Sequence, residues 1–253
     1  MTETHRQNDC TQDALARRNF LRRMAGGAEL ALAPGVILHS VGEARPLDQA
    51  ASQNVRWGML IDTGKCKPGC TACVDACNTE NGLADTGHPA TDAQWIRKLE
   101  VTDPRGGETR SLPMMCQHCA NPPCVDACPT GASFKRADGI VLVDKHSCIG
   151  CRYCMMACPY KARSFVHEPL HDQKPWAPRG KGTVENCTFC VHRIDDGRSP
   201  ACVESCATKA EGALTFGDLN DPDSDISRAL AETQNRQIRA DLGLDPGVRY
   251  SGI

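Results

Sequence analysis

Sixteen of the 17 cysteines in this chain lie between residues 66 and 206, in four groups of four. Each group ends with two cysteines separated by three residues, in the phrases CVDACNT, CVDACPT, CMMACPY and CVESCAT. Four copies of one local pattern indicate an internal repeat. This repeat constrains the fold more than any other feature, because aromatic residues, which usually fill a core, make up only 4% of the chain. The groups are Cys66, Cys70, Cys73 and Cys77; Cys116, Cys119, Cys124 and Cys128; Cys148, Cys151, Cys154 and Cys158; and Cys187, Cys190, Cys202 and Cys206.

The spacing within a group suits a cubic iron–sulfur cluster. Three cysteines in a short loop can each bind a different iron atom, and the fourth follows in a short helix. Four helical residues rise about 6 Å and turn slightly more than one revolution, so the fourth thiolate points away from its own loop. In bacterial two-cluster ferredoxins that cysteine binds the neighbouring cluster. Pro129 and Pro159, directly after the fourth cysteine of the second and third groups, end those helices.

Other cysteine chemistries are less well matched. Structural zinc sites use two separated pairs of ligands, whereas the second and third groups offer three close cysteines and a proline-backed fourth. An even number of cysteines permits a disulfide framework, although disulfide-rich domains rarely repeat one local spacing. Zinc and disulfides remain as alternatives. Attached haem c is excluded, because no cysteine is directly followed by histidine.

Short strands and turns separate the cysteine groups. We expect a strand over 55–62, a hairpin over 96–115 and a second hairpin over 133–144 that turns at Asp138-Gly139. Further strands are expected after the third and fourth groups. The stretch 221–232 places acidic residues as in a calcium loop but lacks the required glycine, so we expect a turn and a capped helix there. The pattern predicts an α+β fold with short helices and small antiparallel sheets.

The N-terminal region has the features of an export signal. Arg17 and Arg18 precede a mildly apolar stretch over 24–41, and small residues follow at a possible cleavage site before Arg45. This order is typical of secretory signals, and the arginine pair favours the twin-arginine route. We therefore expect a signal peptide over 1–44 and a periplasmic protein. The alternative is a basic amphipathic helix at the start of a cytosolic protein.

Charge and hydropathy exclude some partners. The net charge of −2 gives no indication of nucleic-acid binding. No apolar run reaches the roughly eighteen residues that a membrane span needs, so we expect no transmembrane helix. No catalytic triad, phosphate-binding loop or open metal site is evident in the sequence, and we expect an electron carrier rather than an enzyme.

Over residues 55–217 the chain resembles the four-cluster ferredoxin subunits of the DMSO reductase iron–sulfur family. The arginine-pair signal, the stretch DTGKCKPGCTACVDACNTENG and the ending IRADLGLDPGVRY are most similar to periplasmic DsrO-type subunits of the sulfite-reductase-associated transmembrane electron transport complex. The resemblance implies two pseudo-symmetric, bacterial ferredoxin-like halves within residues 45–217. The inner half covers about 112–167, and the outer half covers about 55–111 plus 183–217. Residues 218–253 would form a polar C-terminal extension with short helices.

The resemblance also implies the cluster ligands, which we name sets A to D. Four [4Fe–4S] clusters are expected, and no three-iron cluster, because no cysteine is replaced. Set A is Cys66, Cys70, Cys73 and Cys206; set B is Cys77, Cys187, Cys190 and Cys202; set C is Cys116, Cys119, Cys124 and Cys158; set D is Cys128, Cys148, Cys151 and Cys154.

The outer half departs from the family pattern. Cys66 and Cys70 are separated by three residues where two are usual, and proline does not follow Cys77 or Cys206. The geometry of sets A and B is therefore less well defined by the sequence than that of sets C and D.

The resemblance implies partners as well. These are an integral membrane subunit that interacts with quinones and other redox subunits of a dissimilatory sulfur-metabolism complex. The alternative is a ferredoxin subunit of a molybdopterin oxidoreductase or of a nitrite, tetrathionate or polysulfide reductase system.

Some polar and aromatic residues adjoin the cysteines. Positive charge or N–H donation near a cluster raises its potential, but for each single residue an ordinary solvated side chain is the better interpretation. Tryptophans could carry electrons, although packing is the better interpretation for them. The residues considered are Lys65, Lys67, His118, His146, Arg152 and Lys161, and Trp57, Trp95 and Trp176.

Overall fold

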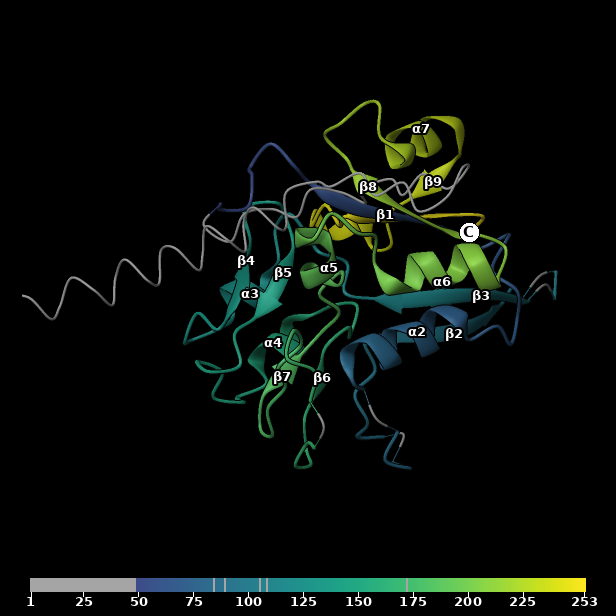
Figure 1. Cartoon of the computed structure of the whole chain (residues 1–253). Helices are drawn as coiled ribbons and strands as arrows, with labels where there is room; N and C mark the ends of the chain where they lie inside the picture. Colours follow the sequence, from purple (N-terminus) through teal and green to yellow (C-terminus); the bar gives the residue numbers. More distant parts are fainter. Residues whose placement is uncertain (1–48, 84, 89, 105, 108, 172) are drawn as a thin grey trace, which may run out of the picture. The chain divides into compact units, whose positions relative to one another are not determined.

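The computed structural model describes residues 49–253, apart from residues 84, 89, 105, 108 and 172 (Figure 1). The predicted signal peptide lies outside the described residues.

A four-stranded sheet is built from both ends of the described chain. Its strand order is β8-β1-β10-β9, with β1 (Trp57–Asp62) pairing antiparallel to β8 (Leu214–Asp218) and parallel to β10 (Val248–Ser251). The strand β9 (Asn235–Arg236) completes the edge. Because β1 is central, its residues from Gly58 to Ile61 are buried. The predicted strand over 55–62 is confirmed.

The end of the chain differs from the expectation of polar turns and short helices alone. The helix α7 (Asp225–Glu232) and the 3-10 helix η1 (Ala240–Leu242) are present, but β9 and β10 add two strands to the main sheet. Val248 and Tyr250 of β10 are fully buried. Sequence reasoning missed β10 because its partner, β1, lies almost the whole described chain away and the strand itself is short.

The helix α7 begins as predicted, with a cap in place of a calcium loop. The hydroxyl of Ser224 accepts a hydrogen bond from Ser227 N and satisfies a free amide of the first turn. Ile226, which occupies the position where a calcium loop needs glycine, is fully buried, and the helix lies against β8.

Three two-stranded sheets connect the cysteine groups. The predicted hairpins are confirmed as β2 (Ile96–Thr102) with β3 (Thr109–Met115), and β4 (Ser133–Lys135) with β5 (Val141–Val143). The third pair joins β6 (Ser164–Phe165) to β7 (Val184–Glu185) across a long loop and was not predicted as a pair.

The short helices that follow the cysteine loops pack in pairs (Figure 1). The helix α2 (Ala72–Asn81) lies against α6 (Ala201–Lys209), and α3 (Pro123–Asp126) lies against α4 (Tyr153–Ala157). A fifth helix, α5 (Val191–Asp195), follows Cys190. The pairing therefore brings the first cysteine group to the fourth and the second group to the third. As expected, α3 and α4 end before Pro129 and Pro159.

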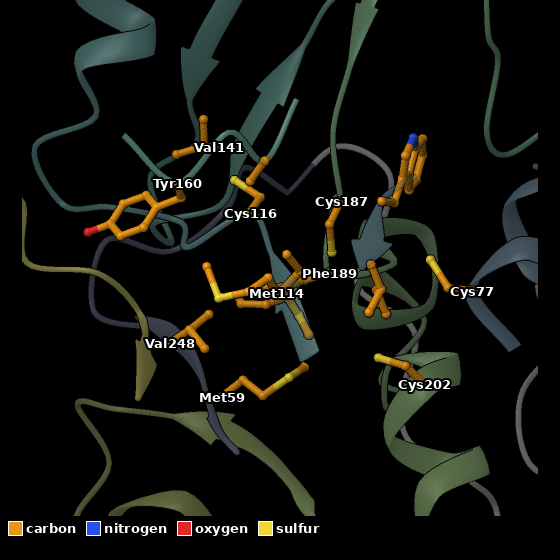
Figure 2. Close-up of a cluster of buried hydrophobic side chains, with 14 of the residues drawn as sticks. Met59, Cys77, Met114, Cys116, Val141, Tyr160, Cys187, Phe189, Cys202 and Val248 are labelled. Atoms are coloured by element: carbon orange, nitrogen blue, oxygen red, sulfur yellow. The ribbon is translucent and has the colours of Figure 1, made fainter. Parts of the chain in front are cut away.

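Thiols occupy much of the core. Figure 2 shows Cys77, Cys187 and Cys202 around one part of a buried cluster that also contains Met59 and Phe189. A set of sulfur-bearing side chains thus takes the place that large apolar residues fill in most domains of this size.

Candidate metal centres

Set A comes together at one cavity. Cys66, Cys70 and Cys73, from the first group, and Cys206, from the end of the fourth, line the same hollow. The hydrogen bond from Ala213 N to Cys206 Sγ is 3.2 Å long. The pairing of α2 with α6 positions these four sulfur atoms together.

Set D lines a second cavity in the same manner. Cys128, from the end of the second group, meets Cys148, Cys151 and Cys154 there. Backbone amides reach two of the sulfur atoms: Ser133 N donates to Cys128 Sγ at 3.3 Å, and Val184 N donates to Cys148 Sγ at 3.5 Å. Cys151 is exposed, so this set is the one with a ligand at the surface.

Sets B and C are identified by the electrostatic influence of their thiols on one another. In set C, burial and then the neighbouring Cys124 and Cys158 raise the pKa of Cys119 to about 12. In set B, burial and then Cys77, Cys202 and Cys190 raise the pKa of Cys187 well above its usual value. Each of these interactions joins cysteines from different groups.

Close, buried thiols of this kind suit a cationic cofactor. Burial and the neighbouring Cys66 and Cys206 raise the pKa of Cys73 to about 11, because several thiolates in one apolar site repel one another. Bound iron removes that repulsion and keeps coordinating thiols deprotonated. The residues therefore fit [4Fe–4S] clusters, which supply one-electron redox chemistry when bound.

A left-handed residue precedes the second cysteine of every group. Gly69, His118, Gly150 and Phe189 have φ values of 75°, 43°, 68° and 53°. Non-glycine residues avoid this conformation, which costs them about 1–2 kcal/mol. Its recurrence shows that the four loops share one backbone turn, even where the sequence offers no glycine to indicate it.

The flanking residues considered from sequence mostly have ordinary roles. Lys65 and Lys67 are largely exposed and pair with Asp62 and Glu211. Arg152 lies over the ring of Phe165, 4.6 Å from its centroid. His146 and Lys161 are exposed.

His118 differs from these, because it is buried. Its Nδ1 accepts a hydrogen bond from Val141 N at 3.0 Å, and its ring stacks on Phe189 at 3.7 Å. Burial, followed by the nearby Arg163, lowers the pKa of His118 to about 3, so the ring is neutral.

The tryptophans serve packing, as the sequence favoured. Trp57 stacks on Phe216 at 5.3 Å and donates to Asp138 Oδ2 at 3.2 Å. Trp95 is buried, and Trp176 Nε1 donates to the carbonyl of Glu80 at 3.0 Å.

Sequence reasoning missed the residue with the closest polar contact to a cysteine sulfur. Arg163 Nη2 donates to Cys124 Sγ at 3.0 Å and to Ser133 Oγ at 2.8 Å. The signal was its position five residues after Cys158, in the phrase CPYKAR, which places it beside a cluster loop.

Comparison with known proteins agrees with this geometry. Two models, each described as a 4Fe-4S dicluster domain, match residues 65–132 and 108–219. The Hdr-like menaquinol oxidoreductase iron-sulfur subunit 1 of Archaeoglobus fulgidus is 41% identical, over 94% of this chain and 98% of that protein. The chain belongs to this family of iron–sulfur subunits. The iron–sulfur subunit is also 36% identical to a tetrathionate reductase subunit of Salmonella typhimurium, over 94% of this chain and 88% of that protein. Protein NrfC of Escherichia coli is 42% identical over 76% of this chain and 78% of its own length.

Family membership decides the nature of the cofactor. The iron–sulfur subunit carries four [4Fe–4S] clusters and transfers electrons within an oxidoreductase system. The zinc and disulfide alternatives are therefore wrong, and all sixteen cysteines from Cys66 to Cys206 are free thiols in the structure. Among the described residues, no helix is long and apolar enough to cross a membrane.

Proposed function

We propose that the iron–sulfur subunit relays single electrons between a quinone-interacting integral membrane subunit and other redox subunits of a dissimilatory sulfur-metabolism complex. The observation that carries this proposal is the succession of neighbouring thiol sets. The thiol of Cys154 is influenced by Cys124 as well as by Cys128, which connects set D to set C. The thiol of Cys202 is influenced by Cys73 as well as by Cys77, which connects set B to set A. Neighbouring clusters of this kind form a path for electrons.

Sets A to D are our proposed cluster ligands. The two cavities and the mutual influence of the thiols support them, since each set combines three cysteines of one group with the last cysteine of its partner group. The pairing of α2 with α6 and of α3 with α4, together with the repeated left-handed turn, supports two pseudo-symmetric halves. The chain itself holds and insulates the clusters, and the partners carry out the chemistry on substrate.

Metal analysis of the anaerobically purified protein tests the cofactor content. About sixteen iron atoms and as many acid-labile sulfides per chain are expected from four clusters. A content of half that amount would reject two of the four proposed ligand sets.

Purification of the native complex tests the electron-transfer role. A haem-bearing membrane assembly whose quinol reduces the clusters, seen by electron paramagnetic resonance, would support the proposal. The second candidate is a subunit of a molybdopterin oxidoreductase, which the similarity to a tetrathionate reductase favours. Co-purification of a molybdopterin subunit, with no haem, would select this second candidate.

We also propose export to the periplasm by the twin-arginine route, supported by the sequence over 1–44. In the native host, the double substitution Arg17→Lys and Arg18→Lys is expected to leave the loaded protein in the cytoplasm. Cell fractionation with an unchanged chain as the control measures this. Equal amounts of both proteins in the periplasm would contradict the proposed route.

A further inference from the structure

Arg163 lies between the two thiol sets of the inner half. It directly precedes β6, it is only 6% exposed, and its Nη2 donates both to Cys124 Sγ of set C and to Ser133 Oγ. Ser133 in turn donates its backbone N–H to Cys128 Sγ of set D. One guanidinium is therefore linked to a ligand of each proposed inner cluster, directly to one and through a single residue to the other.

The remaining donors of Arg163 have no protein partner. Nε and Nη1 are buried and make no hydrogen bond, and no carboxylate pairs with Arg163 among the described residues. A buried cation without an anionic partner is costly, by several kcal/mol. The groups that act on its charge are the thiols of both sets, namely Cys124, Cys116 and Cys154. Clusters bound by these thiolates are anionic and would supply the missing counter-charge.

The outer half handles its cations differently. Arg193, near Cys190, is neutralised by Glu80 and Glu204. Lys98, near set A, is partly exposed and donates to the carbonyls of Lys67 and Cys70, so water screens its charge. The side chain nearest Cys77 is the neutral amide of Asn81, whose Nδ2 is 3.6 Å from Sγ.

We propose that Arg163 is a tuning residue that raises the reduction potentials of the two inner clusters above the values they would otherwise have. A cluster gains negative charge on reduction, and an unscreened buried cation together with N–H donation to sulfur stabilises the reduced form. The effect is larger on the set C cluster, which Arg163 contacts directly, and smaller on the set D cluster. Electrons therefore rest preferentially on the inner pair. This inference rests on the proposed electron-transfer function and on the proposed ligand sets.

Potentiometric titration of the anaerobically purified full chain, followed by electron paramagnetic resonance, tests the inference. In Arg163→Met, which keeps the length but removes the charge, one inner cluster should become at least tenfold harder to reduce. That change is about 59 mV for a one-electron couple. A second cluster should shift in the same direction by less, and the other two should be unchanged. In Arg163→Lys, which keeps the charge but not the forked donor, the shift should have the same sign and be smaller.

Several results would overturn the inference. Unchanged potentials in a fully loaded Arg163→Met protein would do so, as would an equal shift of all four clusters. Loss of iron from both variants would also do so, because Arg163 would then be required for assembly rather than for tuning. Lys98→Met, which removes a screened cation, is the control and should shift its cluster less. Failure of the electron-transfer proposal would look different: the isolated protein would respond to Arg163 as described, yet no quinol would reduce it in the native complex.

Discussion

Buried arginines in the iron–sulfur subunit are neutralised in two different ways. Arg179 and Glu185 pair at 2.8 Å with side chains that are 5% and 0% exposed, and Arg179 Nη1 also donates to the carbonyl of Gly82. Arg163 instead has sulfur and hydroxyl partners. The first arrangement ties the loop over 167–182 to β7, and the second places charge where electrons reside. Chemical similarity between the two residues therefore does not imply similar roles.

Removal of Arg179 should destabilise the protein without altering the clusters. Arg179→Met leaves the carboxylate of Glu185 buried and unpaired, which typically costs about 3–5 kcal/mol. The thermal midpoint, measured anaerobically, should fall clearly, and the reduction potentials should not change. Arg228→Met is the control: its pair with Asp225 is exposed, so the effect should stay below about 0.5 kcal/mol. Equal midpoints for the two variants would show that the Arg179 pair contributes nothing.

At the scale of elements, the cysteine loop is the repeated unit. Each loop passes through a left-handed residue before its second cysteine, and a short helix then carries or precedes the remaining cysteines. In the third loop this residue is Gly150, and a Cβ there would meet the carbonyl oxygen of Gly182. Two independent constraints, backbone conformation and space, thus require glycine at that position.

Gly150→Ala should prevent assembly of the set D cluster. The new methyl group would clash with a backbone atom that cannot move freely, and about four of sixteen iron atoms should be lost. Gly131→Ala is a matched control, since Gly131 has almost the same φ, 69°, but open space around its Cα. That variant should show only the conformational cost, about 1–2 kcal/mol, and full iron content. If both variants load all four clusters, space at Gly150 does not matter.

The elements that sequence could predict were those with local signals. The hairpins over 96–115 and 133–144 had alternating strands and turn residues, and the prolines indicated where α3 and α4 end. The left-handed conformations of His118 and Phe189 had no local signal, because neither residue favours them. The β6–β7 pair and Arg163 depend on contacts between distant segments, which spacing alone does not reveal.

At the scale of the whole molecule, the C-terminal strand holds the main sheet together. Tyr250 is fully buried, its hydroxyl donates to the carbonyl of Pro113 at 3.0 Å, and it accepts from Gln117 Nε2 at 3.1 Å. Gln117 lies in the second cysteine loop, between Cys116 and Cys119. The last strand therefore connects the sheet to the loop that carries set C.

Deletion of residues 248–253 should destabilise the whole described unit. Loss of the buried Val248 and Tyr250 alone should cost roughly 3–6 kcal/mol, at about 1.5–3 kcal/mol for each side chain. Deletion of residues 252–253, which are exposed, is the control and should have little effect. Anaerobic thermal unfolding with iron analysis measures both. Normal stability after the longer deletion would contradict the role assigned to β10.

The central claim is that clusters are shared between cysteine groups, and iron content in double variants tests it most directly. Cys124→Ala with Cys158→Ala removes two ligands from different groups but, in our account, from one cluster, so about twelve iron atoms should remain. Cys154→Ala with Cys158→Ala removes two ligands from one group but from two clusters, so about eight should remain. The reverse result, with the greater loss in the first protein, would contradict the account.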